Sequence, residues 1–231
     1  MTSKKIVALL FVISWSTGCS PLPFQETSHD HLSAASPRDL VQRFAASQAL
    51  RFQLLNSIVF EYNWQAFSGI GYLNVDRDSG RFKVACLNTL GVKLFELSGD
   101  GDQVTDLYTI PAFSRFGSVT AAVGADIRRM YLNIVPSANA EIWWRSDSAV
   151  RLREPSPEGT IEYVFAGPDG DVVEKNCYKE NGLAWRASYY EYREEGGKRF
   201  PRGIVFQNFD YHYRLIVRQR ELIRENDQTG N

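Results

Sequence analysis

Residues 58–66 read Ile-Val-Phe-Glu-Tyr-Asn-Trp-Gln-Ala, an alternation of apolar and mostly polar side chains. Successive side chains of a strand point to opposite faces of a sheet, so this period of two predicts a strand. Phe60, Tyr62 and Trp64 then share its buried face. Gly69 and Gly71 interrupt the alternation, which predicts a bulge or sharp bend. The stretch therefore places a row of aromatic side chains on one face of a sheet.

The segments that follow also have strand periodicity and are joined by tight turns. A second strand runs through Val75 and meets the turn 76–80, after which Phe82, Val84 and Cys86 alternate with polar or small residues. Further strands are predicted over 92–98 and 104–110. Short connections of this kind require antiparallel pairing, so the first half of the chain predicts an antiparallel sheet.

Two segments have the period of a helix instead. Ser36 is a predicted N-cap before Pro37, and the apolar stripe that follows predicts a helix ending near Arg51. A second helix is predicted over 118–134, with Ser118 as its cap. Its apolar stripe consists of Val119, Val123, Ile127, Met130, Tyr131 and Ile134.

Strand patterns then resume and continue almost to the end of the chain. They cover 142–145, 150–153, 161–165, 172–178, 183–192 and a long stretch 204–223 with a possible turn near Tyr211. About ten or eleven strands with two helices exclude a doubly wound parallel sheet. The predicted fold is α+β: a large curled antiparallel sheet, forming an incomplete β-barrel, closed by the two helices.

Composition limits the classes of protein that remain. The 231 residues include 26 basic and 27 acidic side chains, giving a formal net charge of −1, so no nucleic-acid partner is expected. A hydrophobic content of 44% excludes a disordered chain. The charged content of 23% and mean hydropathy of −0.29 exclude a polytopic membrane protein.

The N-terminus has the pattern of an export signal. Lys4 and Lys5 precede an apolar run over residues 6–15, which is too short for a membrane-spanning helix of roughly 20 residues. Gly18-Cys19 then resembles a bacterial lipobox, although Ser16 stands where that motif usually has Leu. The resemblance implies cleavage after residue 18 and acylation of Cys19. The alternative is an ordinary signal peptidase site nearby.

The remaining boundaries follow from this assignment. Residues 19–36 are expected to form the lipidated N-terminus and a flexible tether, 37–225 a single domain, and 226–231 a disordered tail. Ser20 follows the cysteine where an Asp would retain a lipoprotein at the inner membrane. This favours the outer membrane, facing the periplasm.

No recognised catalytic pattern is present in the sequence. His212 is interpreted as structural, and His29 and His31 lie in the expected tether, so we predict no enzyme, no cofactor and no metal site. A hydrolase whose carboxylates are distant in sequence is the weaker alternative. Cys86 and Cys177 either pair as a disulfide or, as we expect, remain separate thiols.

The candidate site is instead apolar. The curled sheet and its crossing helix either pack solid or enclose an apolar cavity, and the sequence leaves both open. The residues expected to line such a cavity are Phe60, Tyr62, Trp64, Phe82, Val84, Val123, Ile127 and Met130.

One stretch resembles the LolA and LolB family of lipoprotein carriers and receptors. Residues 81–97 read Arg-Phe-Lys-Val-Ala-Cys-Leu-Asn-Thr-Leu-Gly-Val-Lys-Leu-Phe-Glu-Leu, a strand, a loop with Leu-Gly, and a strand. This is similar to the LolB segment that carries a protruding leucine, which places Leu90 in that role. Thr89 replaces the proline that precedes that leucine. The best match is an uncharacterised lipoprotein branch allied to LolB.

The resemblance implies a function. It predicts an outer-membrane-anchored, periplasm-facing lipoprotein that binds acyl chains of a lipid or lipoprotein and transfers them, with Leu90 contacting lipid. A periplasmic carrier protein is a possible partner. Leu90 could equally be a core residue folded inward. The alternative function is a non-enzymatic docking subunit of a cell-envelope assembly, with a packed interior.

Overall fold

The computed structural model describes residues 23–26, 31–32, 36–111 and 119–223. Cys19, Ser118 and the predicted tail 226–231 lie outside these ranges. In the described part, no helix combines the length and apolar character needed to cross a bilayer.

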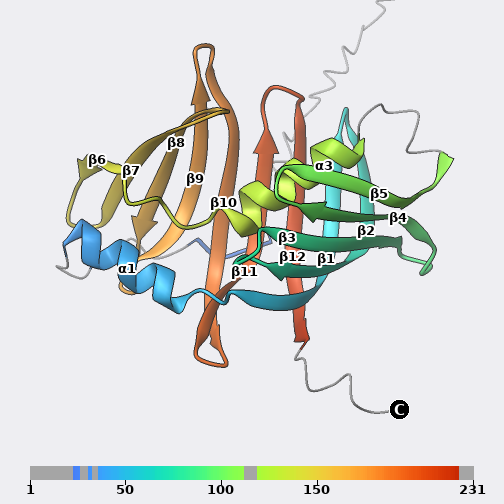
Figure 1. Cartoon of the computed structure of the whole chain (residues 1–231), viewed down its shortest axis with the longest axis horizontal. Coiled ribbons are helices and arrows are strands. Elements are labelled where there is room, and N and C mark those ends of the chain that lie inside the picture. Colours follow the sequence, from blue (N-terminus) through green and yellow to red (C-terminus); the bar gives the residue numbers. More distant parts are fainter. Residues whose placement is uncertain (1–22, 27–30, 33–35, 112–118, 224–231) are drawn as a thin grey trace, which may run out of the picture.

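Twelve antiparallel strands form one sheet (Figure 1). In chain order they are β1 (Arg51–Tyr62), β2 (Gln65–Asp76), β3 (Arg81–Asn88), β4 (Lys93–Asp100), β5 (Gln103–Thr109), β6 (Glu141–Arg145), β7 (Ala149–Ser156), β8 (Gly159–Ala166), β9 (Asp171–Lys179), β10 (Gly182–Glu195), β11 (Lys198–Asn208) and β12 (Tyr213–Ile223). The predicted large antiparallel sheet with two helices is confirmed, and the count exceeds ten or eleven because the last stretch divides into β11 and β12.

The order of the strands explains the position of the second helix. From one edge to the other the sheet runs β5-β4-β3-β2-β1-β12-β11-β10-β9-β8-β7-β6. The chain leaves the sheet at one edge after β5 and returns at the opposite edge as β6. The connection contains helix α3 (Val119–Ile127) and the π-helical turn η1 (Arg128–Leu132), which cross the concave face (Figure 1). The predicted helix over 118–134 is therefore the element that covers this face.

The first helix, α1, spans Pro37–Ser47. It begins where predicted, because the Ser36 side chain accepts a hydrogen bond from the Asp39 amide at 3.2 Å. It ends four residues before the predicted Arg51, since the backbone of Gln48 is already extended and β1 begins at Arg51. The buried Phe44 packs edge-on against Phe165, with 5.6 Å between ring centroids.

A hairpin replaces the single strand predicted over 58–66. β1 ends at Tyr62, and β2 starts at Gln65. Asn63 and Trp64 both have positive φ angles, of 46° and 64°. Two such central residues form the tight turn whose twist matches a two-residue hairpin. The predicted break at Gly69 and Gly71 is wrong, since β2 continues through both residues.

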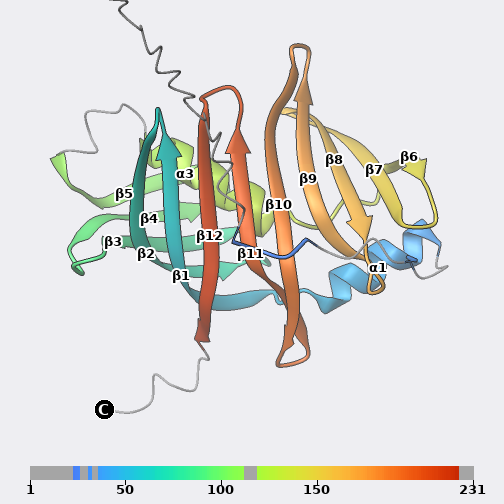
Figure 2. The same ribbon diagram turned by 180° about the vertical axis from the view of Figure 1, so that it is seen from behind.

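Part of the predicted tether lies against the sheet. Residues 23–26 lie on the face of the sheet opposite α3 (Figure 2), where Phe24 is buried, and Leu32 packs at the edge of the main core. The Leu32 amide also donates to the Asp147 carbonyl at 2.9 Å. At these two positions the apolar side chains of Phe24 and Leu32 are therefore wholly or partly removed from water by the sheet.

Candidate functional site

The concave face beneath α3 and η1 is filled with apolar side chains. Phe82 and Val84 of the sheet and Ile127 and Met130 of the helical connection are all buried in one continuous core cluster. Val123 is partly buried and packs against the same cluster. The structure therefore brings five of the predicted lining residues together. Their side chains occupy the space between helix and sheet.

The same face is open at one end of β1. Phe60 is 36% exposed and Tyr62 is 43% exposed. Phe60 lies 5.4 Å from the Tyr213 ring, and the Tyr213 hydroxyl donates to Asp126 on α3, so these rings lie on the side that the helix covers. We call Phe60, Tyr62 and Tyr213 the open concave surface. This surface borders the packed part of the concave face, but the residues of that part do not cover it.

Trp64 does not line the concave face, contrary to the prediction. It is the second residue of the β1–β2 turn, and its relative exposure is 107%. The alternation of faces applies only within a strand. It ends at the turn, so it does not assign Trp64 to the concave face.

Leu90 lies at the tip of the β3–β4 loop and is 86% exposed. It is therefore not a core residue. The Asn88 side-chain oxygen accepts hydrogen bonds from the amides of Leu90 and Val92, at 3.0 and 2.9 Å. Gly91 has a φ of 82°, which a residue without a Cβ adopts readily. This small network presents Leu90 outward on a defined loop.

Polar side chains fasten the helical connection to the sheet through its backbone carbonyls. The Lys175 ammonium donates to the carbonyls of Arg129 and Asn133, at 3.2 and 2.5 Å. The Tyr189 hydroxyl donates to the Met130 carbonyl at 3.2 Å, and the Arg77 guanidinium donates to the Tyr131 carbonyl at 2.7 Å. Carbonyls at a helix C-terminus lack intrahelical partners, so these donors satisfy groups that would otherwise be unpaired.

A partly buried ionic network adds a second set of contacts. Arg129 pairs with Asp126 at 2.9 Å and with Glu158 at 2.8 Å, and Glu158 also accepts from the Trp185 indole at 3.0 Å. Burial raises the pKa of Asp126 to about 6, against the opposing effects of Tyr213 and Arg129. The network ties α3 to the β7–β8 turn and to β10.

Lys175 shows the strongest effect of burial on a basic group in this region. Burial lowers its pKa to about 7, because removing the ammonium from water disfavours its charged form. The ammonium also lies 5.4 Å from the ring centroids of Tyr163 and Trp185. Lys175 and Cys177 are both buried, with relative exposures of 2% and 0%. The sequence neighbours of Lys175, Glu174 and Asn176, are both polar, so no local signal predicted this burial.

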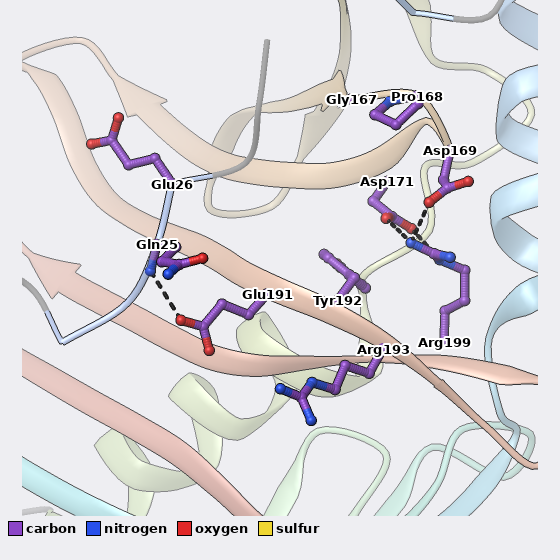
Figure 3. Close-up of a pocket in the computed structure, with 10 residues that line it drawn as sticks. All are labelled: Gln25, Glu26, Gly167, Pro168, Asp169, Asp171, Glu191, Tyr192, Arg193 and Arg199. Carbon is purple, nitrogen blue, oxygen red and sulfur yellow. Dashed lines mark hydrogen bonds and ion pairs between the residues drawn. The ribbon is translucent and has the colours of Figure 1, made fainter. Parts of the chain in front are cut away.

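Two surface hollows are lined mostly by polar residues. One, of about 390 Å³, is formed by Gln25, Glu26, Gly167, Pro168, Asp169, Asp171, Glu191, Tyr192, Arg193 and Arg199 (Figure 3). Within this hollow the Arg199 guanidinium donates hydrogen bonds to both carboxylate oxygens of Asp171. The other, of about 350 Å³, lies over β2 to β5, between residues such as Asp76, Arg81 and Gln103. Neither gives an acyl chain an apolar lining.

The other sequence-based candidates are placed as follows. Cys86 and Cys177 are both buried free thiols, as expected, and burial raises the pKa of Cys86 to about 11. His212 lies in the β11–β12 turn with a φ of 54°. Within the described ranges, no three His, Cys, Asp or Glu residues gather in a way that could hold a metal ion.

Comparison with known proteins gives a structural match only. No protein-family model and no curated protein matches the sequence. A LolA superfamily protein from Nitrosomonas europaea superposes with a TM-score of 0.58 at 11% identity, over 85% of this chain and 99% of that chain. A DUF1329 family protein from Desulfovibrio piger superposes with a TM-score of 0.52 at 8% identity, over 81% and 91% of the two chains. At these identities the match concerns architecture. The chain therefore has the fold of the LolA superfamily.

Proposed function

We propose that this protein is an outer-membrane-anchored, periplasm-facing lipoprotein that binds acyl chains of a lipid or lipoprotein on its concave face and transfers them without covalent chemistry. Cys19 carries the anchor. The proposed branch is the one allied to LolB, which rests on the resemblance of residues 81–97.

The open concave surface is the observation that carries the proposal. Phe60 and Tyr62 expose apolar ring surface on the inside of the curled sheet, where a packed domain would be expected to bury it. The surface is continuous with the core cluster beneath the helix through Tyr213. A hydrocarbon chain that lies on these rings meets an apolar surface without first disrupting the fold.

The size of an acyl chain sets a further requirement. Each buried CH₂ contributes about 0.8 kcal/mol, so a 16-carbon chain brings on the order of 10 kcal/mol that the protein must match to extract it from a bilayer. Three rings do not cover a chain of this length. We therefore propose that the chain enters at the open concave surface and displaces α3 and η1 to reach the apolar face beneath them.

Uptake of a fluorescent fatty acid tests the binding site. Tyr62→Asp places a charge on the open concave surface and is expected to weaken uptake about tenfold or more, because an acyl chain then contacts an ion. Tyr72→Asp is the matched control. Tyr72 lies in the same hairpin, is similarly exposed at 46%, and points to the opposite face. Its substitution is expected to leave uptake unchanged.

Two results would count against the acyl site. Equal loss of uptake in both variants would indicate a general effect on the hairpin rather than a site at Tyr62. Absence of uptake by the unaltered protein, together with no co-purifying lipid in a mass-spectrometric extract, would contradict acyl binding altogether.

The proposed lipid-contacting role of Leu90 has its own test. Leu90→Glu is expected to leave the fold intact, because the side chain is 86% exposed, and to reduce delivery of a bound lipid to acceptor vesicles severalfold. Delivery is measured by transfer of a labelled lipid. If the variant folds and delivers lipid at the normal rate, Leu90 has no such role.

A docking subunit with a packed interior is the second candidate function. The observation that favours it is the filled space beneath the helix, where Ile127, Met130 and Ile134 are almost completely buried. A protein of this kind would be purified free of lipid, and it would bind a partner protein of the cell envelope with equal affinity in the presence and absence of added fatty acid.

A further inference from the structure

The chain that follows the proposed anchor is held on the convex face of the sheet. The Phe24 ring stacks on Tyr190, with 5.3 Å between centroids, and the Arg218 guanidinium lies 4.8 Å from the centroid of the Phe24 ring. A Cβ on Gly203 would lie 2.4 Å from the same ring, so the absence of a side chain at Gly203 leaves the space that Phe24 occupies. Arg218 also donates to the Pro23 carbonyl. The segment is clamped between β10, β11 and β12.

This contact limits how far the domain can stand from the membrane. Cys19 lies only four residues before Pro23, and four residues span at most about 14 Å when fully extended. Arg218 lies five residues from each end of β12, or about 17 Å along the strand. If Cys19 is acylated, either one end of the central strands or the convex face must therefore lie close to the bilayer.

Among the described residues, one of these surfaces presents a row of exposed aromatic side chains at its turns. Tyr62 pairs with Tyr213, so the β1–β2 and β11–β12 turns lie side by side at one end of the sheet, as both views show (Figures 1 and 2). These turns expose Trp64 at 107%, Tyr211 at 69% and Phe209 at 38%. We call these three residues the aromatic turn edge. Tryptophan and tyrosine are the side chains that favour the membrane–water interface.

The competing surfaces have different chemistry. At the opposite end, the β10–β11 turn consists of Gly196 and Gly197, and the β2–β3 turn covers residues 77–80, Arg-Asp-Ser-Gly. The convex face carries ion pairs such as Arg214 with Glu61. Paired charges and short polar turns have no apolar surface to bury in a lipid interface, so they gain no hydrophobic free energy there.

The conformation of Trp64 points in the same direction. A φ of 64° is rare for a bulky residue, and the fold gives it no compensating contact, since the side chain is fully exposed. A bulky residue in this unfavourable conformation, whose side chain packs against none of the described residues, points to a contact outside the domain.

We infer that the aromatic turn edge docks into the interfacial region of the same bilayer that holds the Cys19 anchor, and that the clamped segment at Phe24 keeps it there. The inference rests on the acyl anchor of the proposed function. It orients the domain with its central strands pointing toward the membrane. The open concave surface, which is formed by the last residues of β1 and the first of β12, then faces the lipid.

Fluorescence quenching in vesicles tests this orientation. The full acylated protein is reconstituted into vesicles of phosphatidylethanolamine and phosphatidylglycerol, with and without phospholipids brominated on their acyl chains. Brominated lipid is expected to quench part of the tryptophan emission of the unaltered protein. Trp64→Phe is expected to abolish at least half of that quenching. Trp143→Phe, which removes an exposed tryptophan on the distant edge strand β6, is expected to retain it.

The clamp is tested by two variants of the same protein. Phe24→Ala frees the segment from the sheet, and a ten-residue Gly-Ser insertion after Ser20 lengthens the anchor without changing Phe24. Each is expected to reduce quenching at least twofold while the protein still floats with the vesicles. Unchanged quenching in the insertion variant would overturn the role of the clamp.

The outcomes separate this inference from the function on which it rests. If the unaltered protein does not float with vesicles, the anchor itself is wrong. If it floats but brominated lipid quenches the unaltered and Trp64→Phe proteins equally, the docking edge is wrong while anchoring and acyl uptake remain possible. A protein partner for the aromatic turn edge would give this second result.

Discussion

Trp64 is expected to destabilise the fold while it contributes to the proposed membrane contact. A left-handed conformation costs a non-glycine residue about 1–2 kcal/mol, more than the extra entropy of about 0.5–1 kcal/mol that glycine loses on folding. Asn-Gly is also a preferred pair for this turn. Trp64→Gly is therefore expected to raise the free energy of unfolding by about 0.5–1 kcal/mol, measured by urea denaturation of the full chain.

A stability comparison with Trp143 provides the control. Trp143 lies within β6 and does not have a positive φ, so Trp143→Gly is expected to lower the free energy of unfolding. A lower urea midpoint for Trp64→Gly as well would show that the Trp64 side chain stabilises the domain. It would also remove the conformational argument for an external contact.

Lys175 predicts a pH dependence of stability in the neutral to alkaline range. Its pKa is about 7 in the folded protein and near 10.5 when unfolded, so between these values the unfolded chain binds the additional proton. The free energy of unfolding is then expected to rise with pH, by about 1.4 kcal/mol per pH unit from this group. Urea unfolding between pH 7 and 8.5 measures the slope before the buried thiols contribute.

Two substitutions assign that slope to its residue. Lys175→Met removes the titrating group at similar volume and is expected to abolish the rise. Lys179→Met, which removes an exposed lysine paired with Asp210, is expected to retain it. A slope that persists in Lys175→Met would show that another group titrates, and that Lys175 is charged throughout this range.

For individual residues, the sequence predicted which side chains share a face of the sheet. It was less successful in predicting which of these side chains are buried. The period of two predicted Phe82 and Val84 on the inner face, the helical period predicted Ile127 and Met130 on the stripe that faces it, and the structure buries all four. Phe60 shares the concave face but is partly exposed, because coverage depends on where a distant helix crosses the sheet. Periodicity within a strand contains no information on that crossing.

The helical connection of α3 and η1 is the element on which the proposed acyl binding depends. Gly124 approaches β5 so closely that a Cβ on it would lie 3.3 Å from the Cβ of Val104. Disulfides form at Cβ separations of about 3.5–4.5 Å, so a shift of a few tenths of an ångström is enough for Gly124→Cys with Val104→Cys to link helix and sheet. Fatty-acid uptake by the oxidised double variant is expected to fall at least about tenfold if the helix must move.

Reduction of the engineered link supplies the control. The native thiols of Cys86 and Cys177 are buried and unpaired, so the engineered pair is the one expected to oxidise. Adding dithiothreitol is expected to restore uptake in the same sample. Equal uptake in both redox states would show that acyl chains bind at the open concave surface without displacement of the helix.

Element boundaries were predictable where local chemistry determines them. Ser36 and Pro37 define the start of α1 through a hydrogen bond and a fixed φ. The Asn63-Trp64 turn was not predictable, because tryptophan is not a residue that favours a positive φ and the alternation of residues 58–66 continues through it. The tight turn became evident from strand pairing, in which Tyr62 faces Gln65.

For the molecule as a whole, the sequence predicted the fold class but not the order of the strands. Ten of the eleven neighbouring pairs in the sheet join strands consecutive in the chain, and short turns imply such pairs. The pair of β1 with β12 joins residues about 160 positions apart, and no local signal predicts it. The position of Phe24 on the convex face depends on the same central strands, so the sequence did not predict it either.

The sheet can be completed only after β12 has been synthesised, because β12 pairs with β1 at the centre of the sheet. An emerging chain can form β1 to β5 and later β6 to β11 as separate meanders, each leaving an unpaired inner edge until Ile223 has been synthesised. Closing contacts of such long sequence separation form late and slowly. Under the proposed export, we expect these unpaired strand edges to need shielding by a chaperone until the final residues have emerged.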